Sequence, residues 1–381
     1  MSGAGGSLRI LSVMGTRPEA IKMAPVVQAV AAQAGLEGGL CVTAQHREML
    51  DQVLAHFDLK ADFDLDLMRR AQGLGYITGA VLEGMETVLK EFKPDWVVVQ
   101  GDTTTTFAAA LAAFYLKIKV AHVEAGLRTG NIYSPYPEEM NRRLTTRLAT
   151  LHFPPTEGSR ANLLAEGVPA DRIVVTGNTV IDALVWTRDH IKADPALEAS
   201  IAKAYPFLDK KRRMILVTGH RRENFDGGLE RVFRALGDLA KRPDVQIVFP
   251  VHLNPKVQEA ANTILHGIGN VHLIPPQPYR EFVWLMAQSH LIVTDSGGIQ
   301  EEAPGLGIPV LVTRDTTERP EGMQAGTLEL IGTDGAKLLE RASALLDDAK
   351  QYERMSRANN PYGDGLAAGR IVRSLINASI S

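Results

Sequence analysis

Short apolar runs alternate along this chain with longer segments whose apolar residues recur at the spacing of an amphipathic helix. The short runs are residues 10–14, 40–43, 96–100, 120–123, 151–153 and 173–176 in the first half, and residues 214–218, 246–251, 271–274, 291–294 and 310–313 in the second. Strands that alternate with helices are typical of a parallel sheet with helices on both faces. The pattern predicts an α/β fold of two doubly wound, Rossmann-like domains.

A helical segment separates the two halves. Residues 181–206 carry few strand signals, so we expect the chain to cross between domains near residues 177–185. The predicted N-terminal domain spans residues 1–178, the predicted C-terminal domain spans residues 179–366, and the last helix, within residues 367–381, is expected to pack back on the N-terminal domain. Ligands of open parallel sheets bind beyond the carboxyl ends of the strands, so polar residues that follow a strand are the candidate site residues.

The composition restricts the classes of function. The 381 residues are 45% hydrophobic and 22% charged, with a net charge of -3 and a pI near 6.4. A general nucleic-acid or anionic-membrane binder needs a basic surface, so neither partner is expected. The single cysteine, Cys41, excludes a disulfide within the chain, and no signal peptide or membrane-spanning run is visible. These features predict a cytoplasmic protein, with residues 1–7 as a flexible terminus.

Residues 295–302, DSGGIQEE, follow an apolar run and open a predicted helix. Gly297 and Gly298 let backbone N–H groups approach an anion, and the helix N-terminus beyond Ser296 attracts negative charge. Glu302, one turn later, can hold ribose hydroxyls. The segment indicates a nucleoside diphosphate ligand, although an ordinary strand-to-helix turn with an N-cap gives the same letters.

A second anion site is expected after the first strand, in residues 15–22, GTRPEAIK. Pro18 suits the first turn of a helix, and Arg17 and Lys22 place two cations near that turn. Arginine can fork onto phosphate oxygens, and a helix N-terminus adds N–H donors. The alternative interpretation is a solvated first turn.

Two carboxylates follow neighbouring strands. Asp102 comes after residues 96–100, and Glu124 is presented from the next strand, where period-two alternation places it on the same side as His122. Two carboxylates at one sheet edge can serve as acid and base if their surroundings separate their pKa values. For Asp102, an N-capping role is the alternative.

Three further candidates come from a loop–helix junction and from the second domain. Glu138 and Arg142 lie four residues apart on one predicted helix face, which suggests an ion pair, either in the site or as surface decoration. His220 follows residues 214–218 and could supply a proton or a positive charge to a leaving phosphate. A histidine at a strand end is often structural, so this alternative also stays open.

The sequence gives no support for a metal or a redox cofactor. A metal site is the rival interpretation of Asp102, His122, Glu124 and His220, but their spacing matches no tight ligand motif. The phosphate loop of P-loop enzymes, the serine-hydrolase elbow and an early dinucleotide fingerprint are missing as well. No cofactor and no metal are therefore expected.

Eight blocks of sequence cover nearly the whole chain in order. They are GTRPEAIKMAPV (15–26), TAQHREML (43–50), QGDTTTT (100–106), HVEAGLRT (122–129), SPYPEEMNRRL (134–144), TGNTVID (176–182), TGHRREN (218–224) and DSGGIQEEAPGLGIPVLVTRDTTERPE (295–321). Together they resemble the non-hydrolysing bacterial UDP-N-acetylglucosamine 2-epimerases. The resemblance implies a GT-B-like pair of domains with the active site between them and a cytoplasmic homodimer. It also implies interconversion of UDP-N-acetylglucosamine and UDP-N-acetylmannosamine for surface polysaccharides.

The same resemblance assigns roles to residues. The family's catalytic positions fall on Asp102, Glu124, Glu138, Arg142 and His220. Its UDP-contacting positions fall on Arg17, Gln277, Phe282, Ser296, Gly297, Gly298, Glu302 and Arg319, with residues 277–282 at the uracil. Gln277, Phe282 and Arg319 rest on the resemblance alone. Some members are activated by a second substrate molecule and tend to carry Gln and Arg where this chain has Glu48 and Ala71. This departure puts allosteric activation in question.

The implied substrate constrains the mechanism. Its C2 hydrogen lies next to no carbonyl, whereas loss of UDP leaves an electron-poor C1 that acidifies C2. Elimination to 2-acetamidoglucal and re-addition of UDP is therefore the expected route, with Arg17, Arg142 and His220 stabilising the departing diphosphate. Which carboxylate acts as base and which as acid stays open. The alternatives are a hydrolysing epimerase that releases N-acetylmannosamine and UDP, a glycosyltransferase, and a catalytically silent UDP-sugar sensor.

Overall fold

The computed structural model describes residues 7–43, 47–67, 73–221 and 224–380. The chain forms two compact units, which we call unit 1 (Met1–Ala183 with Gly363–Ser381) and unit 2 (Leu184–Tyr362). Glu48 lies in a helix, but its side chain is outside the described part, as are residues 1–6 and Ala71. The expectations that concern these residues stay predictions.

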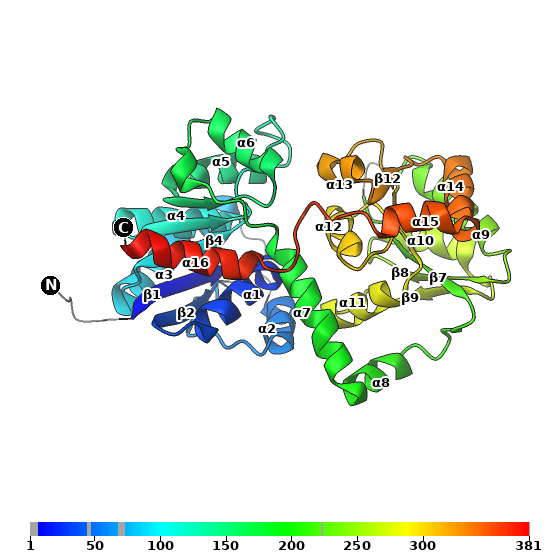
Figure 1. Ribbon diagram of the computed structural model, residues 1–381, viewed down its shortest axis with the longest axis horizontal. Helices are drawn as coiled ribbons and strands as arrows, with labels where there is room; N and C mark the ends of the chain where they lie inside the picture. The colour runs from blue at the N-terminus through cyan, green and yellow to red at the C-terminus, as the bar shows by residue number, and fades with distance from the viewer. Residues whose placement is uncertain (1–6, 44–46, 68–72, 222–223, 381) are drawn as a thin grey trace. The chain divides into compact units, whose positions relative to one another are not determined.

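Unit 1 is an α/β unit in which strands and helices alternate along the chain (Figure 1). Its strands are β1 (Leu8–Met14), β2 (Leu36–Val42), β3 (Phe63–Asp64), β4 (Trp96–Gln100), β5 (Lys119–Val123) and β6 (Leu151–Phe153). Its helices are α1 (Arg17–Ala32), α2 (Arg47–His56), α3 (Leu74–Phe92), α4 (Thr104–Tyr115), α5 (Glu138–Leu148), α6 (Glu157–Ala165), the 3-10 helix η1 (Ala170–Arg172) and α16 (Ala367–Ile380). Helix α7 (Thr179–Ala193) runs across the boundary between the units.

Unit 2 repeats the alternation. Its strands are β7 (Arg213–Thr218), β8 (Val245–Pro250), β9 (Val271–Ile274), β10 (Leu291–Thr294), β11 (Val310–Val312) and β12 (Leu328–Leu330). Its helices are α8 (Pro195–Lys203), α9 (Gly228–Leu239), α10 (Pro255–Leu265), α11 (Tyr279–Gln288), α12 (Gly297–Gly305), α13 (Pro320–Ala325), α14 (Gly335–Asp347) and α15 (Ala349–Ser356).

Each unit contains one parallel sheet whose strand order reverses at its centre. Over the described residues, the order is β3-β2-β1-β4-β5-β6 in unit 1 and β12-β11-β10-β7-β8-β9 in unit 2. The central pairs are β1 with β4 and β7 with β10, both parallel. The prediction of two doubly wound domains is confirmed. Ligands of such sheets bind where the order reverses, so the two switch points lie beyond these central pairs.

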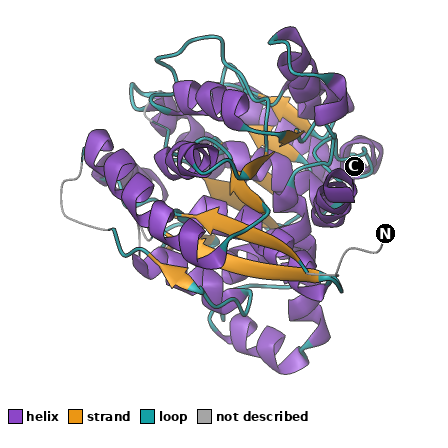
Figure 2. Ribbon diagram, turned by 90° about the vertical axis from the view of Figure 1, so that its left-hand side faces the viewer, coloured by secondary structure: helices purple, strands orange, loops and turns teal. Residues whose placement is uncertain are grey.

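The sheets are buried on both faces, which explains their continuous apolar runs. All five residues of β4 are buried in unit 1, and the alanines of α4 allow this helix to pack closely against α3. Figure 2 shows strands of unit 1 with helices on either side. Within the described ranges, none of the helices combines the length and the apolar character that a bilayer crossing requires.

The C-terminal helix belongs to unit 1. Helix α16 lies beside α1 (Figure 1), and the side chain of Ser379 accepts a hydrogen bond from Nε1 of Trp96 at 2.8 Å. Its first turn is capped by Asp182, whose carboxylate accepts from the N–H groups of Ala367 at 3.2 Å and Ala368 at 2.8 Å. Burial raises the pKa of Asp182 despite these bonds.

One predicted strand is wrong and two short strands were not predicted. In residues 173–176, Ile173 makes a single parallel bridge to His152, and the segment is otherwise irregular. Its partner β6 has only 3 residues, because two prolines follow it and cannot donate to a ladder. Strands β3 and β12, of 2 and 3 residues, are too short to give an alternating pattern.

Candidate active site

Asp102 lies at the switch point of unit 1, in the turn between β4 and α4. Gly101 has a φ of 73°, which glycine adopts without strain and which reverses the chain after the strand. Arg142 of α5 donates to Oδ2 of Asp102 through Nε at 3.0 Å and also through Nη2. Asn141 holds the Asp102 carbonyl at 3.0 Å. The turn is therefore fixed by side chains of α5, and Arg142 follows Asp102 by 40 residues in the chain.

Glu124 lies one residue beyond β5 in a backbone conformation that is unusual for glutamate. Its φ is 60°, and only 8% of the residue is exposed. Its Oε2 accepts from Nζ of Lys22 and from Nε2 of Gln100, both at 2.5 Å. A left-handed conformation costs a non-glycine residue about 1 kcal/mol or more. The surrounding contacts must offset this cost to hold the carboxylate in its orientation.

This geometry corrects the expectation that His122 and Glu124 share a face of a strand. The strand ends at Val123, so alternation does not determine where the Glu124 side chain points. His122 instead places Nε2 2.7 Å from the carbonyl oxygen of Gly101. Burial lowers the pKa of His122 to about 4, so this imidazole is neutral and holds the Gly101 turn as a hydrogen-bond donor.

The ion pair expected between Glu138 and Arg142 is also corrected. Glu139, which is fully buried, takes that place, with Oε2 at 3.2 Å from Nη1 of Arg142 and Oε1 at 3.0 Å from Nε of Arg143. The Glu139 carboxylate also accepts from the N–H of Thr129 at 3.1 Å, so this side chain faces into unit 1. Glu138 has no hydrogen bond or ion pair within the described part, so its carboxylate is not committed to a protein partner.

The start of α1 differs from the open anion site that we expected. Thr16 and Glu19 form a capping box, in which Glu19 accepts from the N–H groups of Gly15 at 3.0 Å and Thr16 at 2.7 Å. Pro18 has no N–H, so few backbone donors of this turn remain for an outside anion. The side chain of Arg17 remains available, whereas Lys22 pairs with Glu124.

His220 follows β7 and is held by a buried carboxylate. Oδ2 of Asp295 accepts from the N–H groups of His220 and Arg221, both at 2.8 Å, and Oδ1 lies 3.1 Å from Nδ1 of His220. Burial alone raises the pKa of Asp295, but the His220 side chain and the Arg221 N–H outweigh it, and the net pKa is lowered. The ring of His252 stacks on that of His220 at 5.3 Å. Nδ1 therefore faces Asp295, which leaves Nε2 for a ligand.

Helix α12 begins directly beyond Asp295 and has no side-chain cap. Ser296 is the N-cap residue, but its hydroxyl does not accept from the first turn. The first N–H groups of a helix have no intrahelical partner, so this start is open to an anion. A Cβ on Gly297 would lie 3.3 Å from Cζ of Arg319, so glycine lets the guanidinium approach the helix start. Arg319 is oriented by Glu301, at 2.8 Å from Nε.

Glu302 stands one turn into the same helix. It is 8% exposed, and its Oε1 accepts from the hydroxyl of Tyr279 at 3.0 Å. Gln277 is fixed in turn, because it accepts from the Tyr205 hydroxyl at 2.6 Å and donates to the Pro275 carbonyl at 2.5 Å. The half-buried Phe282 lies on the same helix, α11, as Tyr279. Segment 277–282 is thus joined to α12.

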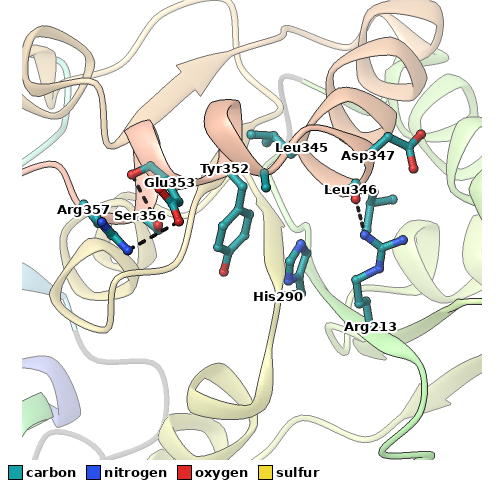
Figure 3. A pocket seen from close by; sticks show the side chains of 10 residues that line it. Arg213, His290, Leu345, Leu346, Asp347, Tyr352, Glu353, Ser356 and Arg357 are labelled. Atoms are coloured by element: carbon teal, nitrogen blue, oxygen red, sulfur yellow. Dashed lines mark hydrogen bonds and ion pairs between the residues drawn. The ribbon is translucent and has the colours of Figure 1, made fainter.

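A pocket of about 420 Å³ lies elsewhere in unit 2 (Figure 3). It is lined by Arg213 at the start of β7 and by His290 directly before β10, so it lies at the amino ends of these strands. The rings of His290 and Tyr352 stack there at 4.2 Å. None of the candidate residues lines this pocket, which separates it from the switch point.

The structure thus groups the candidates within each unit. Asp102 joins Arg142, Lys22 joins Glu124, and Ser296, Gly297, Gly298, Glu302 and Arg319 surround the start of α12. Sequence reasoning missed the supporting residues Glu19, Gln100, Glu139, Tyr279 and Asp295. A T-x-x-E capping pattern at Thr16–Glu19 was the one available signal. The described residues contain no group of three or more His, Cys, Asp or Glu side chains that could hold a metal ion.

The fold defines a class of protein, one with two Rossmann-like units as in GT-B-like structures. A glycosyltransferase from Rickettsia africae supports the fold assignment alone, at 13% identity and a TM-score of 0.60 over 98% of this chain and 97% of that chain. The arrangement of acidic residues in unit 1 and an open helix start in unit 2 is compatible with chemistry on a nucleotide-linked substrate.

The particular family follows from closer relatives. The family model described as UDP-N-acetylglucosamine 2-epimerase matches residues 28–376. A protein of that name from Yersinia pestis is 59% identical over 98% of this chain and 100% of its own length. The crystal structure of UDP-GlcNAc 2-epimerase from Neisseria meningitidis bound to UDP-GlcNAc is 51% identical, with a TM-score of 0.89 over 97% of this chain and 100% of that chain. The chain belongs to the UDP-N-acetylglucosamine 2-epimerase family, which confirms the resemblance seen in the sequence.

Proposed function

We propose that this chain catalyses reversible C2 epimerisation of UDP-N-acetylglucosamine to UDP-N-acetylmannosamine without net hydrolysis. The observation that carries the proposal is the arrangement of acidic residues in unit 1. Asp102 and Glu124 are each held by a cationic side chain, and Glu138 is uncommitted. A protein that only binds a UDP-sugar has no need of two carboxylates oriented by cationic side chains with a third acidic residue left uncommitted.

Unit 2 supplies the nucleotide site in this proposal. The diphosphate takes the open N-terminus of α12 at Ser296, Gly297 and Gly298. The Arg319 guanidinium lies beside Gly297 and is itself paired with Glu301 and Glu318. Glu302, oriented by Tyr279, accepts from the ribose hydroxyls. Segment 277–282 receives the uracil, a role that the family resemblance suggests.

The chemical step breaks the C1–O bond and the C2–H bond. The electron pair of the C1–O bond leaves with UDP, a carboxylate takes the C2 proton, and the product is 2-acetamidoglucal. Return of a proton to the opposite face of C2 and addition of a UDP oxygen to C1 complete the inversion. The candidate carboxylates are Asp102, Glu124 and Glu138, and the geometry of unit 1 leaves their individual assignment open.

Cationic groups stabilise the departing diphosphate. His220 is suited to this role because Asp295 fixes its ring and leaves Nε2 for the phosphate. Arg17 remains available as a second cation. The guanidinium of Arg142 is already bonded to Asp102, so we assign Arg142 to orienting that carboxylate rather than to the phosphate.

The remaining parts of the proposal concern the cellular setting. We expect a cytoplasmic homodimer that supplies surface polysaccharide synthesis, with no cofactor, no nucleic acid and no membrane as partner. Light scattering of the purified protein tests the dimer.

Proton NMR in deuterated water tests the activity. With UDP-N-acetylglucosamine as the sole addition, UDP-N-acetylmannosamine that carries deuterium at C2 is the expected product. Free UDP with N-acetylmannosamine would instead indicate the hydrolysing class, and the absence of turnover with retained UDP binding would indicate a sensor.

A further inference from the structure

Glu19 is a buried carboxylate outside the predicted catalytic set. It lies in the first turn of α1 and is 2% exposed. It forms no ion pair within the described part of the chain, in contrast to Glu124 and Glu139. A carboxylate that is taken out of water without a cation is costly, so its retention needs a specific set of hydrogen bonds.

Both oxygens of Glu19 are fully used, and they reach two different turns. Oε2 accepts from the N–H groups of Gly15 at 3.0 Å and Thr16 at 2.7 Å, in the turn between β1 and α1. Oε1 accepts from the Thr103 hydroxyl at 2.6 Å and lies 3.0 Å from the Thr106 hydroxyl, which shares its one proton between Glu19 and the Gln100 carbonyl, at the start of α4. A capping glutamate needs only the first pair of contacts. The second pair ties α1 to the neighbouring turn across the switch point.

One of these turns holds Asp102, and residues beside both turns contact Glu124, which follows β5. Thr103 directly follows Asp102 in the chain. The Thr106 hydroxyl also lies 2.6 Å from the Gln100 carbonyl, and the Gln100 side chain donates to Glu124. The α1 turn leads to Lys22, the cationic partner of Glu124.

The two turns are also in close contact at Gly15. A Cβ on Gly15 would lie 2.5 Å from Oγ1 of Thr105 on α4 and 2.3 Å from Oγ1 of Thr43. Gly15 thus leaves room for the Thr43 and Thr105 hydroxyls, which lie 3.0 Å apart, and the β1–α1 turn packs directly against α4. Burial raises the pKa of Glu19 although all four hydrogen bonds lower it, which agrees with a group retained for its geometry.

We propose that Glu19 is a positioning residue that locks the β1–α1 turn to the β4–α4 turn and thereby fixes Asp102 and Glu124 for the C2 proton transfers. The proposal rests on the epimerase function proposed above. It acts through the orientation of other groups, because Glu19 itself is enclosed by backbone and threonine side chains.

The test compares Glu19→Ala, Glu19→Gln and a matched control, Asp182→Asn, in the full-length protein. Asp182 is another buried carboxylate of unit 1 that accepts backbone N–H groups, but it caps α16. The readouts are kcat and KM for C2 epimerisation, the rate of deuterium incorporation at C2, and the Kd for UDP. Wild-type protein must first epimerise the substrate, and its failure to do so would overturn the proposed function before any variant is compared.

Glu19→Ala is expected to lower kcat by about 30-fold or more, because displacements of about 1 Å at catalytic groups cost rates of that order. Its KM and its Kd for UDP should change by less than about 3-fold. Glu19→Gln should recover most of the lost kcat, since the amide oxygen can accept from both N–H groups and the amide nitrogen can donate to both hydroxyls. Asp182→Asn should keep the wild-type kcat.

Two outcomes contradict the proposal. Unchanged kcat in Glu19→Ala would mean that the tie is not needed for turnover, and a Glu19→Gln variant as slow as Glu19→Ala would mean that charge or proton transfer at Glu19 matters instead. If Glu19→Ala does not fold, Thr103→Val removes the shorter of the two α4 contacts to Glu19 together with the N-cap bond of α4, and Thr103→Ser restores the hydroxyl for both. Thr103→Val should then lower kcat several-fold and Thr103→Ser should recover it; equal kcat values in the two variants overturn the proposal.

Discussion

The two switch points begin their helices in opposite ways. In unit 1 the start of α1 is closed by its own carboxylate, because Glu19 takes the N–H groups of Gly15 and Thr16. In unit 2 the start of α12 has no side-chain cap, and Arg319 lies against Gly297. One turn has an internal anion, and the other is open to an external one. The same fold thus separates a site for holding catalytic carboxylates from a site for binding a diphosphate.

The buried carboxylates at these two turns, Glu19 in unit 1 and Asp295 in unit 2, also differ in their neighbours and in the direction of their pKa shifts. Asp295 has an imidazole beside it and two backbone donors, and the net effect lowers its pKa. Glu19 has only neutral donors, and burial dominates to raise its pKa. Asp295 thus has a titratable ring as a neighbour, whereas Glu19 accepts from backbone N–H groups and threonine hydroxyls.

The largest effect is expected from Asp102→Asn in unit 1. Loss of a general acid or base costs about 100-fold to 10,000-fold in rate, so kcat should fall by about 1,000-fold. The Kd for UDP should change by less than about 2-fold, because the nucleotide site is assigned to unit 2. Turnover by NMR and UDP binding by calorimetry measure the two quantities. Asp171→Asn, at an exposed aspartate of η1, is the control. Full activity of Asp102→Asn would remove this residue from the mechanism.

A smaller loss is expected when the Asp295–His220 pair is broken in unit 2. Asp295→Asn should lower kcat by about 10-fold to 100-fold, since the imidazole loses the negative charge beside Nδ1. If Asp295 acts through His220, the variant His220→Ala with Asp295→Asn should be no slower than His220→Ala alone. Additive losses in this double-mutant cycle would show that Asp295 has a separate role.

The apolar pattern of the sequence predicted most of the fold, whereas the roles of the site residues stay predictions. The bounds of β4, β6, β9 and β10 agree with the expected runs, and β4 and β10 are mostly apolar segments that are buried throughout. Segment 173–176 has the same apolar character but no strand beyond β6 that could extend a ladder. The local sequence pattern reflects the character of the side chains, whereas a strand also needs a neighbouring strand with which to form hydrogen bonds.

The partners of charged residues were the least predictable feature of the site. Spacing favoured Glu138 for Arg142, but the structure selects Glu139, because this side chain is buried and accepts from Thr129. The pairing of Arg142 with Asp102 joins residues 40 positions apart. Such contacts depend on how α5 packs against α4, which no local pattern contains.

A modest effect on nucleotide binding is expected from Tyr279→Phe. The change removes only the hydroxyl that donates to Glu302, and one hydrogen bond to a charged group contributes about 1.5 kcal/mol or somewhat more. Because Glu302 keeps its place on α12, we expect the Kd for UDP to rise by about 3-fold to 10-fold. Tyr352→Phe is the matched control, since Tyr352 lines the pocket at the amino ends of the strands. Equal effects of the two variants on UDP affinity would contradict the assignment of Glu302 to the ribose.

The smallest effect concerns how stability depends on pH at the two buried carboxylates. The raised pKa of Glu19 means that the folded state binds more protons than the unfolded state above about pH 4.5, so its contribution to stability falls as pH rises through the folded pKa. The lowered pKa of Asp295 has the opposite effect: its contribution to stability is present above the unfolded value near 3.8 and is lost as pH falls through the folded pKa.

Urea unfolding of wild type, Glu19→Gln and Asp295→Asn between about pH 3 and pH 8 measures both contributions. The free energy of unfolding of Glu19→Gln relative to wild type should increase with pH, and that of Asp295→Asn relative to wild type should decrease. Slopes of the same sign would contradict the opposite directions of the two pKa shifts.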